Sequence, residues 1–143
     1  MSDHRLSYAE CRDVLRTRLA ERPPTRLQVL TGPRQVGKTT LLLELARAER
    51  DGAVYFPGDG PEATLPGAWE RLWQQADSVA REIGRCVVLI DEAHLVHDWA
   101  SRLKGEWDRV ERLRLPIHVV ATGSSALRLA PDPVRASPDA SSG

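Results

Sequence analysis

The sequence predicts an α/β fold, a three-layer sandwich in which helices cover both faces of a parallel sheet. Between residues 27 and 122, short apolar segments alternate with longer segments of helical periodicity, which is typical of consecutive βαβ units. Residues 86–90, "CVVLI", are apolar throughout, as expected of a strand buried on both faces. A chain of 143 residues with 41% hydrophobic and 28% charged residues suits one such globular domain.

The first half of the chain contains two predicted helices and two predicted strands. Residues 7–21 carry apolar side chains at helical spacing, and "RPP" at residues 22–24 ends that helix. Residues 27–31, "LQVLT", predict a short strand. Residues 38–50 contain strong helix formers and no breaker, so they predict a helix. The second strand is expected at residues 53–56, "AVYF".

The second half begins with residues 57–67, "PGDGPEATLPG", whose three prolines and three glycines predict a mobile loop. Amphipathic helices are expected at residues 68–83 and 99–113, and a fourth strand at residues 117–121, "IHVVA". The proline-rich end is expected to be disordered. The apolar stripes of the two helices consist of Trp69, Leu72, Trp73, Ala76, Val79, Ala80 and Ile83, and of Trp99, Leu103, Trp107, Val110 and Leu113.

A phosphate-binding loop connects the first strand to the following helix. The residues "GPRQVGKT" match G-x-x-x-x-G-K-[ST], the Walker A motif of P-loop NTPases, in which backbone N–H groups and a helix N-terminus surround an anion. Lys38 would contact the β- and γ-phosphates of ATP, and the Thr39 hydroxyl would bind Mg²⁺. Lys38 is one of only two lysines in the chain. The expected nucleotide-binding residues are Gly32, Pro33, Arg34, Gln35, Val36, Gly37, Lys38, Thr39 and Thr40.

An acidic pair follows the buried strand, as in a Walker B motif. In "CVVLIDEAH", Asp91 and Glu92 stand at the carboxyl end of the strand, where α/β sheets bind their ligands. We expect Asp91 to hold Mg²⁺ through water, and Glu92 to orient and deprotonate the attacking water. A solvated acidic helix cap is the alternative interpretation of this pair. His94 and His97 have no third ligand nearby, so no zinc site is expected.

The segment "VVATGSSAL" predicts a strand that ends in hydroxyl-bearing residues. If this strand lies beside the first one, Ser124 would stand near the γ-phosphate and help to place the catalytic water. A helix N-cap by Ser124 or Ser125 explains the same residues equally well, and the two roles are compatible.

Composition excludes several classes of partner. The net charge is zero, which argues against nucleic acid, and no apolar run is long enough to span a bilayer. The charged N-terminus is no secretory signal, and Cys11 and Cys86 lack metal-binding spacing. We therefore expect a cytoplasmic protein.

Three segments together resemble a family of prokaryotic AAA+-like P-loop ATP-binding proteins: "GPRQVGKTTLL", "LIDEAHLVHDWASRLKGEWD" and "ATGSSAL". In that family a large C-terminal domain of unknown function usually follows the ATPase core. The resemblance covers roughly residues 26–129, so residues 1–25 are assigned as an N-terminal helix and linker, and residues 130–143 as a disordered tail. It implies that Lys38 and Thr39 contact phosphate and Mg²⁺, that Asp91 and Glu92 form the acid pair, and that Ser124 senses phosphate.

The resemblance ends after Leu129, where family members continue into a fifth strand and the second domain. Its AAA+-like strand order would place that strand beside "LQVLT", which would otherwise be a sheet edge. We expect the chain to lack this strand, as a truncated or split gene product would. Another copy of the chain or a protein partner would then cover the edge.

The sequence therefore predicts an ATP-binding domain with Mg²⁺-dependent hydrolysis. Arg128 and Arg135 are the candidate arginine fingers after the last strand, and without a finger hydrolysis would be slower by roughly 10³- to 10⁵-fold. A non-hydrolysing, nucleotide-dependent interaction module is the main alternative. A DEAH-type helicase fragment is a further one, although no residues remain for a second nucleotide-binding lobe.

Overall fold

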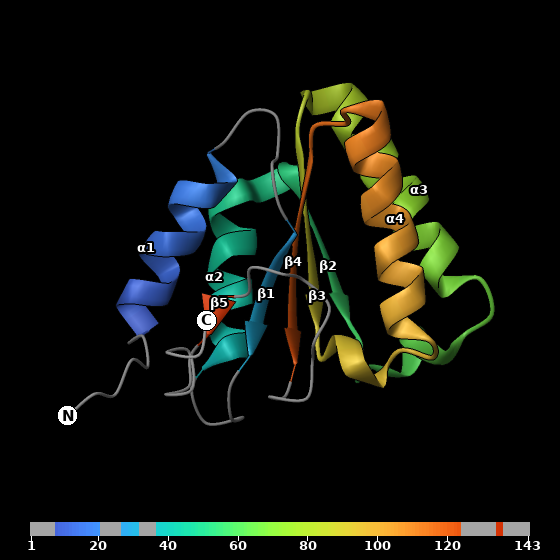
Figure 1. Cartoon of the computed structure of the whole chain (residues 1–143), viewed down its shortest axis with the longest axis horizontal. Helices are drawn as coiled ribbons and strands as arrows, with labels where there is room; N and C mark the ends of the chain where they lie inside the picture. The colour runs from blue at the N-terminus through green and yellow to red at the C-terminus, as the bar shows by residue number, and fades with distance from the viewer. Residues whose placement is uncertain (1–7, 21–26, 32–36, 124–133, 136–143) are drawn as a thin grey trace.

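The computed structural model describes residues 8–20, 27–31, 37–123 and 134–135, which form a parallel sheet between two pairs of helices (Figure 1). The strand order is β2-β3-β4-β1-β5, and every strand pair is parallel. The strands are β1 (Gln28–Thr31), β2 (Ala53–Pro57), β3 (Cys86–Asp91), β4 (Ile117–Gly123) and β5 (Val134–Arg135). The α-helices are α1 (Tyr8–Leu19), α2 (Lys38–Glu49), α3 (Ala68–Ile83) and α4 (Trp99–Leu113). The predicted fold class is confirmed.

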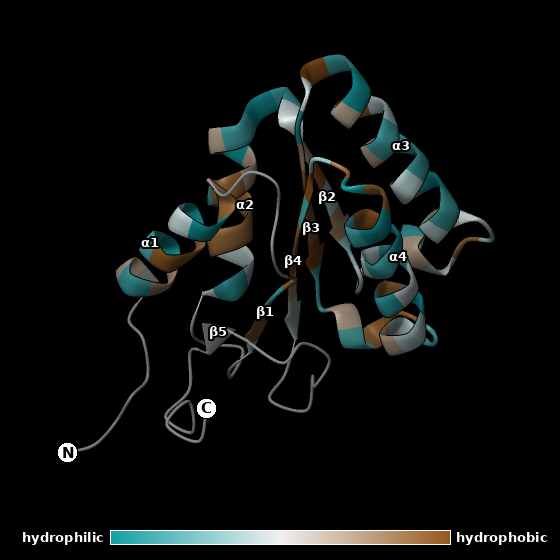
Figure 2. Ribbon diagram, turned by 45° about the horizontal axis from the view of Figure 1, so that its top comes forward, coloured by the Kyte–Doolittle hydropathy of each residue, from teal (hydrophilic) through white to brown (hydrophobic). Residues whose placement is uncertain are grey.

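Each face of the sheet has its own apolar core. α1 and α2 cover one face, and α3 and α4 cover the other (Figure 1). Successive residues of β3 point to opposite faces, so Val87 joins the core under α2 whereas Val88 joins the core under α3. Figure 2 shows the hydrophobic colouring on β3 and along α2. All six residues of β3 are buried, as the continuously apolar sequence predicts.

Helix α1 packs against the core on the same face as α2. Its residues Cys11, Leu15 and Leu19 are four positions apart, and all three are buried. The guanidinium of Arg12 also lies 3.6 Å from the carboxylate of Glu44 on α2. The predicted N-terminal helix therefore contributes directly to one of the two cores.

Helices α3 and α4 bury most of their predicted stripes but not the last residue of either one. Ile83 is 52% exposed and Leu113 is 55% exposed, and each is the final residue of its helix. Gly84 and Arg114 follow them with φ angles of 89° and 53°, left-handed conformations that end a helix. No helix in the described part of the chain is long and apolar enough to span a bilayer.

The segment between β2 and α3 is more structured than the predicted mobile loop. It contains a 3₁₀ helix, η3 (Pro61–Thr64), and a hydrogen bond of 2.7 Å from the Gly58 N–H to the carbonyl of Asp91. The prolines and glycines correctly indicated an interruption of regular structure. They could not indicate that the backbone of this segment forms a hydrogen bond with the end of β3.

The sheet position beside β1, which the sequence left empty, is held by the two residues of β5. Val134 pairs with Leu30, and Arg135 pairs with Thr31, both in parallel. β1 is therefore not a fully open edge, because part of its outer side pairs with β5. The predicted disordered tail contains this strand, and its other residues lie outside the described part of the chain.

Candidate functional site

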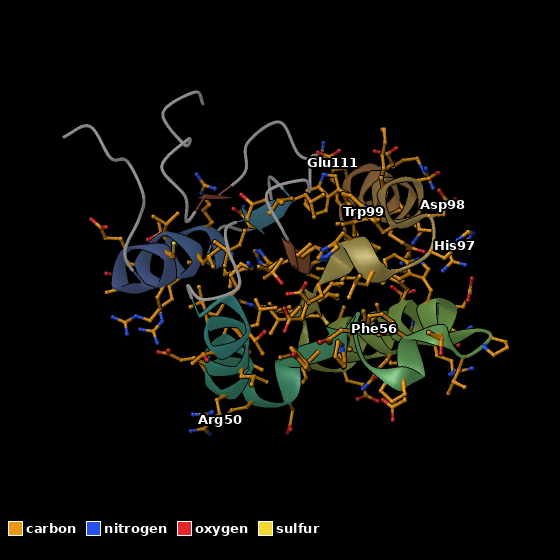
Figure 3. All side chains as sticks on the ribbon, turned by 90° about the horizontal axis from the view of Figure 1, so that it is seen from below. Arg50, Phe56, His97, Asp98, Trp99 and Glu111 are labelled. Atoms are coloured by element: carbon orange, nitrogen blue, oxygen red, sulfur yellow. The ribbon has the colours of Figure 1, made fainter. Side chains whose placement is uncertain are left out.

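The candidate site lies where the parallel strands end. In Figure 1 the strands point downward, so this edge faces the reader in Figure 3, which views the molecule from below. Figure 3 shows Phe56 near the end of β2, and Asp98 and Trp99 at the start of α4, on this side. Helix α2 also begins here. Ligands of open α/β sheets bind at this edge.

The start of α2 presents the last part of the predicted phosphate loop. Residues 32–36 lie outside the described part of the chain, and the description resumes at Gly37. Gly37 adopts φ 79° and ψ 27°, a left-handed conformation that glycine adopts readily, and its carbonyl accepts the Leu41 N–H. Lys38 is buried with 4% exposure, whereas Thr39 and Thr40 are exposed. This helix start provides N–H groups and a cation for an anion.

Asp91 is the centre of the hydrogen-bonded part of the site. Its carboxylate is 2% exposed and accepts hydrogen bonds from three hydroxyl groups on three different elements. Thr39 of α2 and Tyr55 of β2 donate to Oδ2 at 2.7 and 2.9 Å, and Thr122 of β4 donates to Oδ1 at 2.6 Å. A carboxylate offers about four acceptor positions, and donors among the described residues fill three of them. These hydrogen bonds offset the cost of burying a polar group away from water.

Tyr55 is a site residue that the sequence analysis missed. Burial raises the pKa of its phenol above the usual value, and the hydrogen bond to the Asp91 carboxylate raises it further, so the hydroxyl remains a donor. The only available signal was the alternation along β2, which turns Tyr55 to the α2 side of the sheet and Phe56 to the other side. That pattern cannot indicate which residue the hydroxyl would reach.

Glu92 is held mainly through its backbone. It adopts φ 49° and ψ 50°, an uncommon conformation for a residue with a side chain, and its N–H donates to the Thr122 hydroxyl at 3.1 Å. Its side chain is 12% exposed, and Oε1 lies 3.4 Å from Nε2 of His94. Nδ1 of His94 is buried without a hydrogen-bond partner among the described residues.

Gly58 is a second missed residue, and it supports the backbone of the acidic pair. A Cβ atom at Gly58 would lie 2.5 Å from the carbonyl oxygen of Glu92 and 2.7 Å from that of Asp91. Real Cβ atoms essentially never approach so closely. Only glycine therefore allows the segment after β2 to lie against the end of β3.

Thr122 is the hydroxyl that the structure brings to Asp91 from the end of β4. The sequence pattern indicated a run of hydroxyls there and favoured Ser124, which lies outside the described residues, as does Arg128. Arg135 is in β5. The structure thus brings Lys38, Thr39, Asp91 and Glu92 to one edge of the sheet. Their roles stay predictions, as do those of Ser124 and of residues 32–36, which lie outside the described residues.

The donor set fits Mg²⁺. This ion prefers oxygen ligands and usually keeps several of its waters. The Thr39 hydroxyl oxygen and the Asp91 carboxylate are 2.7 Å apart, so both can face one ion, and an acceptor position of Asp91 that no described residue fills suits a metal-bound water. The described ranges contain no group of three or more His, Cys, Asp or Glu side chains that could hold a metal ion.

Comparison with protein families matches residues 24–137 to the AAA domain. Among solved structures, the chain is similar to PCH-2 of C. elegans, with a TM-score of 0.57 and 18% identity over 90% of this chain and 39% of that one. It is also similar to katanin, in a structure from work on katanin self-assembly, with a TM-score of 0.50 and 19% identity over 79% of this chain and 38% of that one. No curated protein matches the sequence. These identities show the fold alone, and the chain spans less than two fifths of either structure.

Proposed function

Because the chain belongs to the AAA domain family, we propose that it binds ATP together with Mg²⁺ and hydrolyses the γ-phosphate. One observation carries this proposal. The hydroxyl of Thr39, next to Lys38 at the start of α2, donates to the carboxylate of Asp91 at 2.7 Å, although the two residues are 52 positions apart. A phosphate-binding helix start and a metal-binding acid thus meet at one point, as phosphoryl transfer requires.

Each residue has a separate role in the proposed reaction. Lys38 binds the β- and γ-phosphate oxygens, and Thr39 and Asp91 hold the ion, which when bound neutralises charge on those oxygens. Glu92 accepts a proton from a water whose oxygen forms a bond to the γ-phosphorus, while the bond from that phosphorus to the bridging oxygen breaks. The predictions that residues 32–37 surround the phosphates and that Ser124 approaches the γ-phosphate complete this scheme.

The Glu92 backbone is already constrained for this role. Its left-handed conformation is fixed by the hydrogen bond to Thr122 on one side and by the close approach of Gly58 on the other. A general base must lie within hydrogen-bond reach of the water it activates, so a fixed backbone reduces the entropy lost in that alignment. No arginine finger is assigned, and a rate lower by roughly 10³- to 10⁵-fold is expected without one.

The test is an ATP titration with and without Mg²⁺, followed by a turnover assay. We expect Lys38→Ala to abolish binding, and Glu92→Gln to bind ATP normally but hydrolyse it about 10²- to 10⁴-fold more slowly. Lys104→Ala is the matched control, because Lys104 is the only other lysine and its exposed ammonium pairs with Asp108 on α4. Equal ATP affinity in wild type and Lys38→Ala would refute the proposal.

The non-hydrolysing interaction module makes a different prediction for the same assay. It requires that ATP binding depends on Lys38. It also requires that the wild-type protein turns over ATP no faster than the Glu92→Gln variant does. The acid pair favours the enzyme, because the Thr122 hydroxyl binds both the Asp91 carboxylate and the Glu92 N–H and so holds the two acids together at the end of β3.

A further inference from the structure

We propose that Tyr55 is a positioning residue of the metal site, whose hydroxyl fixes the Asp91 carboxylate so that one acceptor position faces the Mg²⁺ hydration shell. This inference rests on the proposed function and adds a residue to it. Tyr55 belongs to neither of the two nucleotide-binding motifs, and it lies 36 positions before Asp91 in the chain.

The hydrogen bonds around Asp91 determine its orientation. Oδ2 accepts from both Thr39 and Tyr55, at 2.7 and 2.9 Å, and Oδ1 accepts from Thr122 at 2.6 Å. A bound metal would also use the Thr39 hydroxyl as a ligand. Tyr55 and Thr122, which lie on strands, are therefore the two donors that hold one carboxylate oxygen each independently of the metal. Loss of Tyr55 leaves Oδ2 with the Thr39 donor alone among the described residues, and loss of Thr122 removes the donor to Oδ1.

Strand β2 holds the Tyr55 ring rigidly. The strand pairs in register with β3, with Tyr55 opposite Leu89 and Pro57 opposite Asp91. Tyr55 packs against the core under α2, whereas the neighbouring Phe56 packs edge-on against Trp69 on the opposite face, with ring centroids 6.1 Å apart. A register slip of one residue would exchange these two rings between faces, so the observed register is what places the Tyr55 hydroxyl beside Asp91.

The count of acceptor positions gives the functional consequence. Donors among the described residues fill about three of the four acceptor positions of the carboxylate, and without Tyr55 they fill two. The position that Tyr55 vacates lets the carboxylate rotate or bind an unrelated water, which disturbs the geometry that Mg²⁺ demands. Loss of a residue that orients a metal ligand typically lowers metal affinity 10- to 100-fold.

The test is Tyr55→Phe, which keeps the packed ring and removes only the hydroxyl. We expect the Mg²⁺ concentration for half-maximal hydrolysis to rise about tenfold at saturating ATP. The second readout does not depend on turnover: the thermal-unfolding shift produced by ADP alone should stay unchanged, and the additional shift produced by Mg²⁺ should require about tenfold more metal. Tyr8→Phe, at the start of α1, removes the hydroxyl of the only other tyrosine and is the control.

A further measurement needs no variant at Tyr55. In the Tyr8→Phe protein Tyr55 is the single tyrosine, so ¹³C labelling of tyrosine at Cζ reports on its hydroxyl alone. We expect this NMR signal to shift when Mg²⁺ joins ADP and to move less with ADP alone. An unmoved signal, or a Tyr55→Phe protein with the Mg²⁺ dependence of wild type, would overturn the inference and leave the proposed function intact. A wild-type protein that binds no nucleotide would overturn both.

Discussion

The two ends of strand β3 bury an ionisable side chain in opposite ways. Cys86, at the amino end, is fully buried, and burial, reinforced by the charges of Asp77 and Glu49, raises the pKa of its thiol to about 12. The thiol therefore stays neutral. Asp91, at the carboxyl end, is 2% exposed, and its carboxylate accepts three hydroxyl hydrogen bonds. Among the described residues, the same strand thus contains one buried acid with no side-chain hydrogen bond and one with three.

This difference shows that an acid buried at the end of a strand needs hydrogen-bond donors from neighbouring elements if it is to form part of a binding site. A buried ionisable group becomes neutral unless neighbouring elements supply donors for its charged form. The donors of Asp91 come from α2, β2 and β4, which all meet at the carboxyl edge of the sheet. The hydroxyl of Thr122 also binds the backbone of Glu92, so the two acids share one support. Removing donors from Asp91 should therefore destabilise this end at neutral pH, whereas the ionisation of Cys86 should affect stability only at alkaline pH.

The largest effect is expected from Thr122→Val, which keeps the shape of the side chain and removes its hydroxyl. The change leaves the buried Asp91 oxygen without a donor and the Glu92 N–H without an acceptor. Each buried group that loses its partner costs about 1–3 kcal/mol, so we expect a loss of about 3 kcal/mol in the free energy of unfolding. Urea unfolding measures this loss.

The matched control for this prediction is Thr64→Val in η3. The Thr64 hydroxyl is exposed and donates only to the nearby carbonyl of Pro61, at 2.8 Å. Solvent replaces that bond, so the change should stay within about 0.5 kcal/mol. Similar losses in the two variants would mean that the hydroxyls around Asp91 do not stabilise this end of β3.

A smaller loss is expected from Gly58→Ala, which disturbs the backbone behind both acids. The added methyl would lie 2.5 Å from the Glu92 carbonyl oxygen, so one of the two backbone segments must move. Overpacking of this kind costs about 1–3 kcal/mol, and we expect about 2 kcal/mol in urea unfolding.

Gly105→Ala tests whether that cost arises from the contact and not from the loss of a glycine. Gly105 lies within α4, and a Cβ atom there would meet no other atom within 4 Å. Alanine should stabilise the helix by about 0.5–1 kcal/mol. A loss at both glycines would contradict the account of Gly58 as a close backbone contact.

The sequence was sufficient to predict the parts of the site that follow one another in a motif. The spacing from Gly37 to Thr39 identified the start of α2, and the apolar run before Asp91 identified a strand buried on both faces. Both signals are local, because a phosphate loop and a central strand are defined by consecutive residues. The order of helices and strands was predictable for the same reason.

The parts that could not be predicted depend on register between distant segments. Tyr55 and Thr122 reach Asp91 across 36 and 31 positions, and nothing in β2 or β4 alone shows which residue will stand opposite. The sequence indicated Gly58 only as a residue that interrupts regular structure. The position requires glycine because a side chain there would collide with the backbone of Glu92. β5 was missed because a two-residue strand has no periodicity. Its formation depends on the edge of β1 and not on its own composition.

The last effect comes from the thiol at the other end of β3, and it differs from the others because it is expected only above pH 9. The ordinary pKa of a cysteine thiol is 9.0, and burial raises that of Cys86 to about 12. The folded protein therefore holds the proton more tightly than the unfolded chain. The resulting stabilisation is complete below pH 9 and is lost as the pH rises from 9 toward 12. The slope contributed by one proton is at most about 1.4 kcal/mol per pH unit.

Cys86→Ala should flatten this alkaline slope without abolishing it, because other buried acids titrate in the same range. Burial also raises the pKa of Cys11, which remains in both proteins, so the difference between the two slopes isolates Cys86. The measurement is urea unfolding at pH 8, 9, 10 and 11 under reducing conditions. Identical slopes would show that the folded protein lets this thiol ionise as easily as the unfolded chain does. In that case burial without donors would not be enough to keep an acid neutral, and the contrast between the two ends of β3 would lose its physical basis.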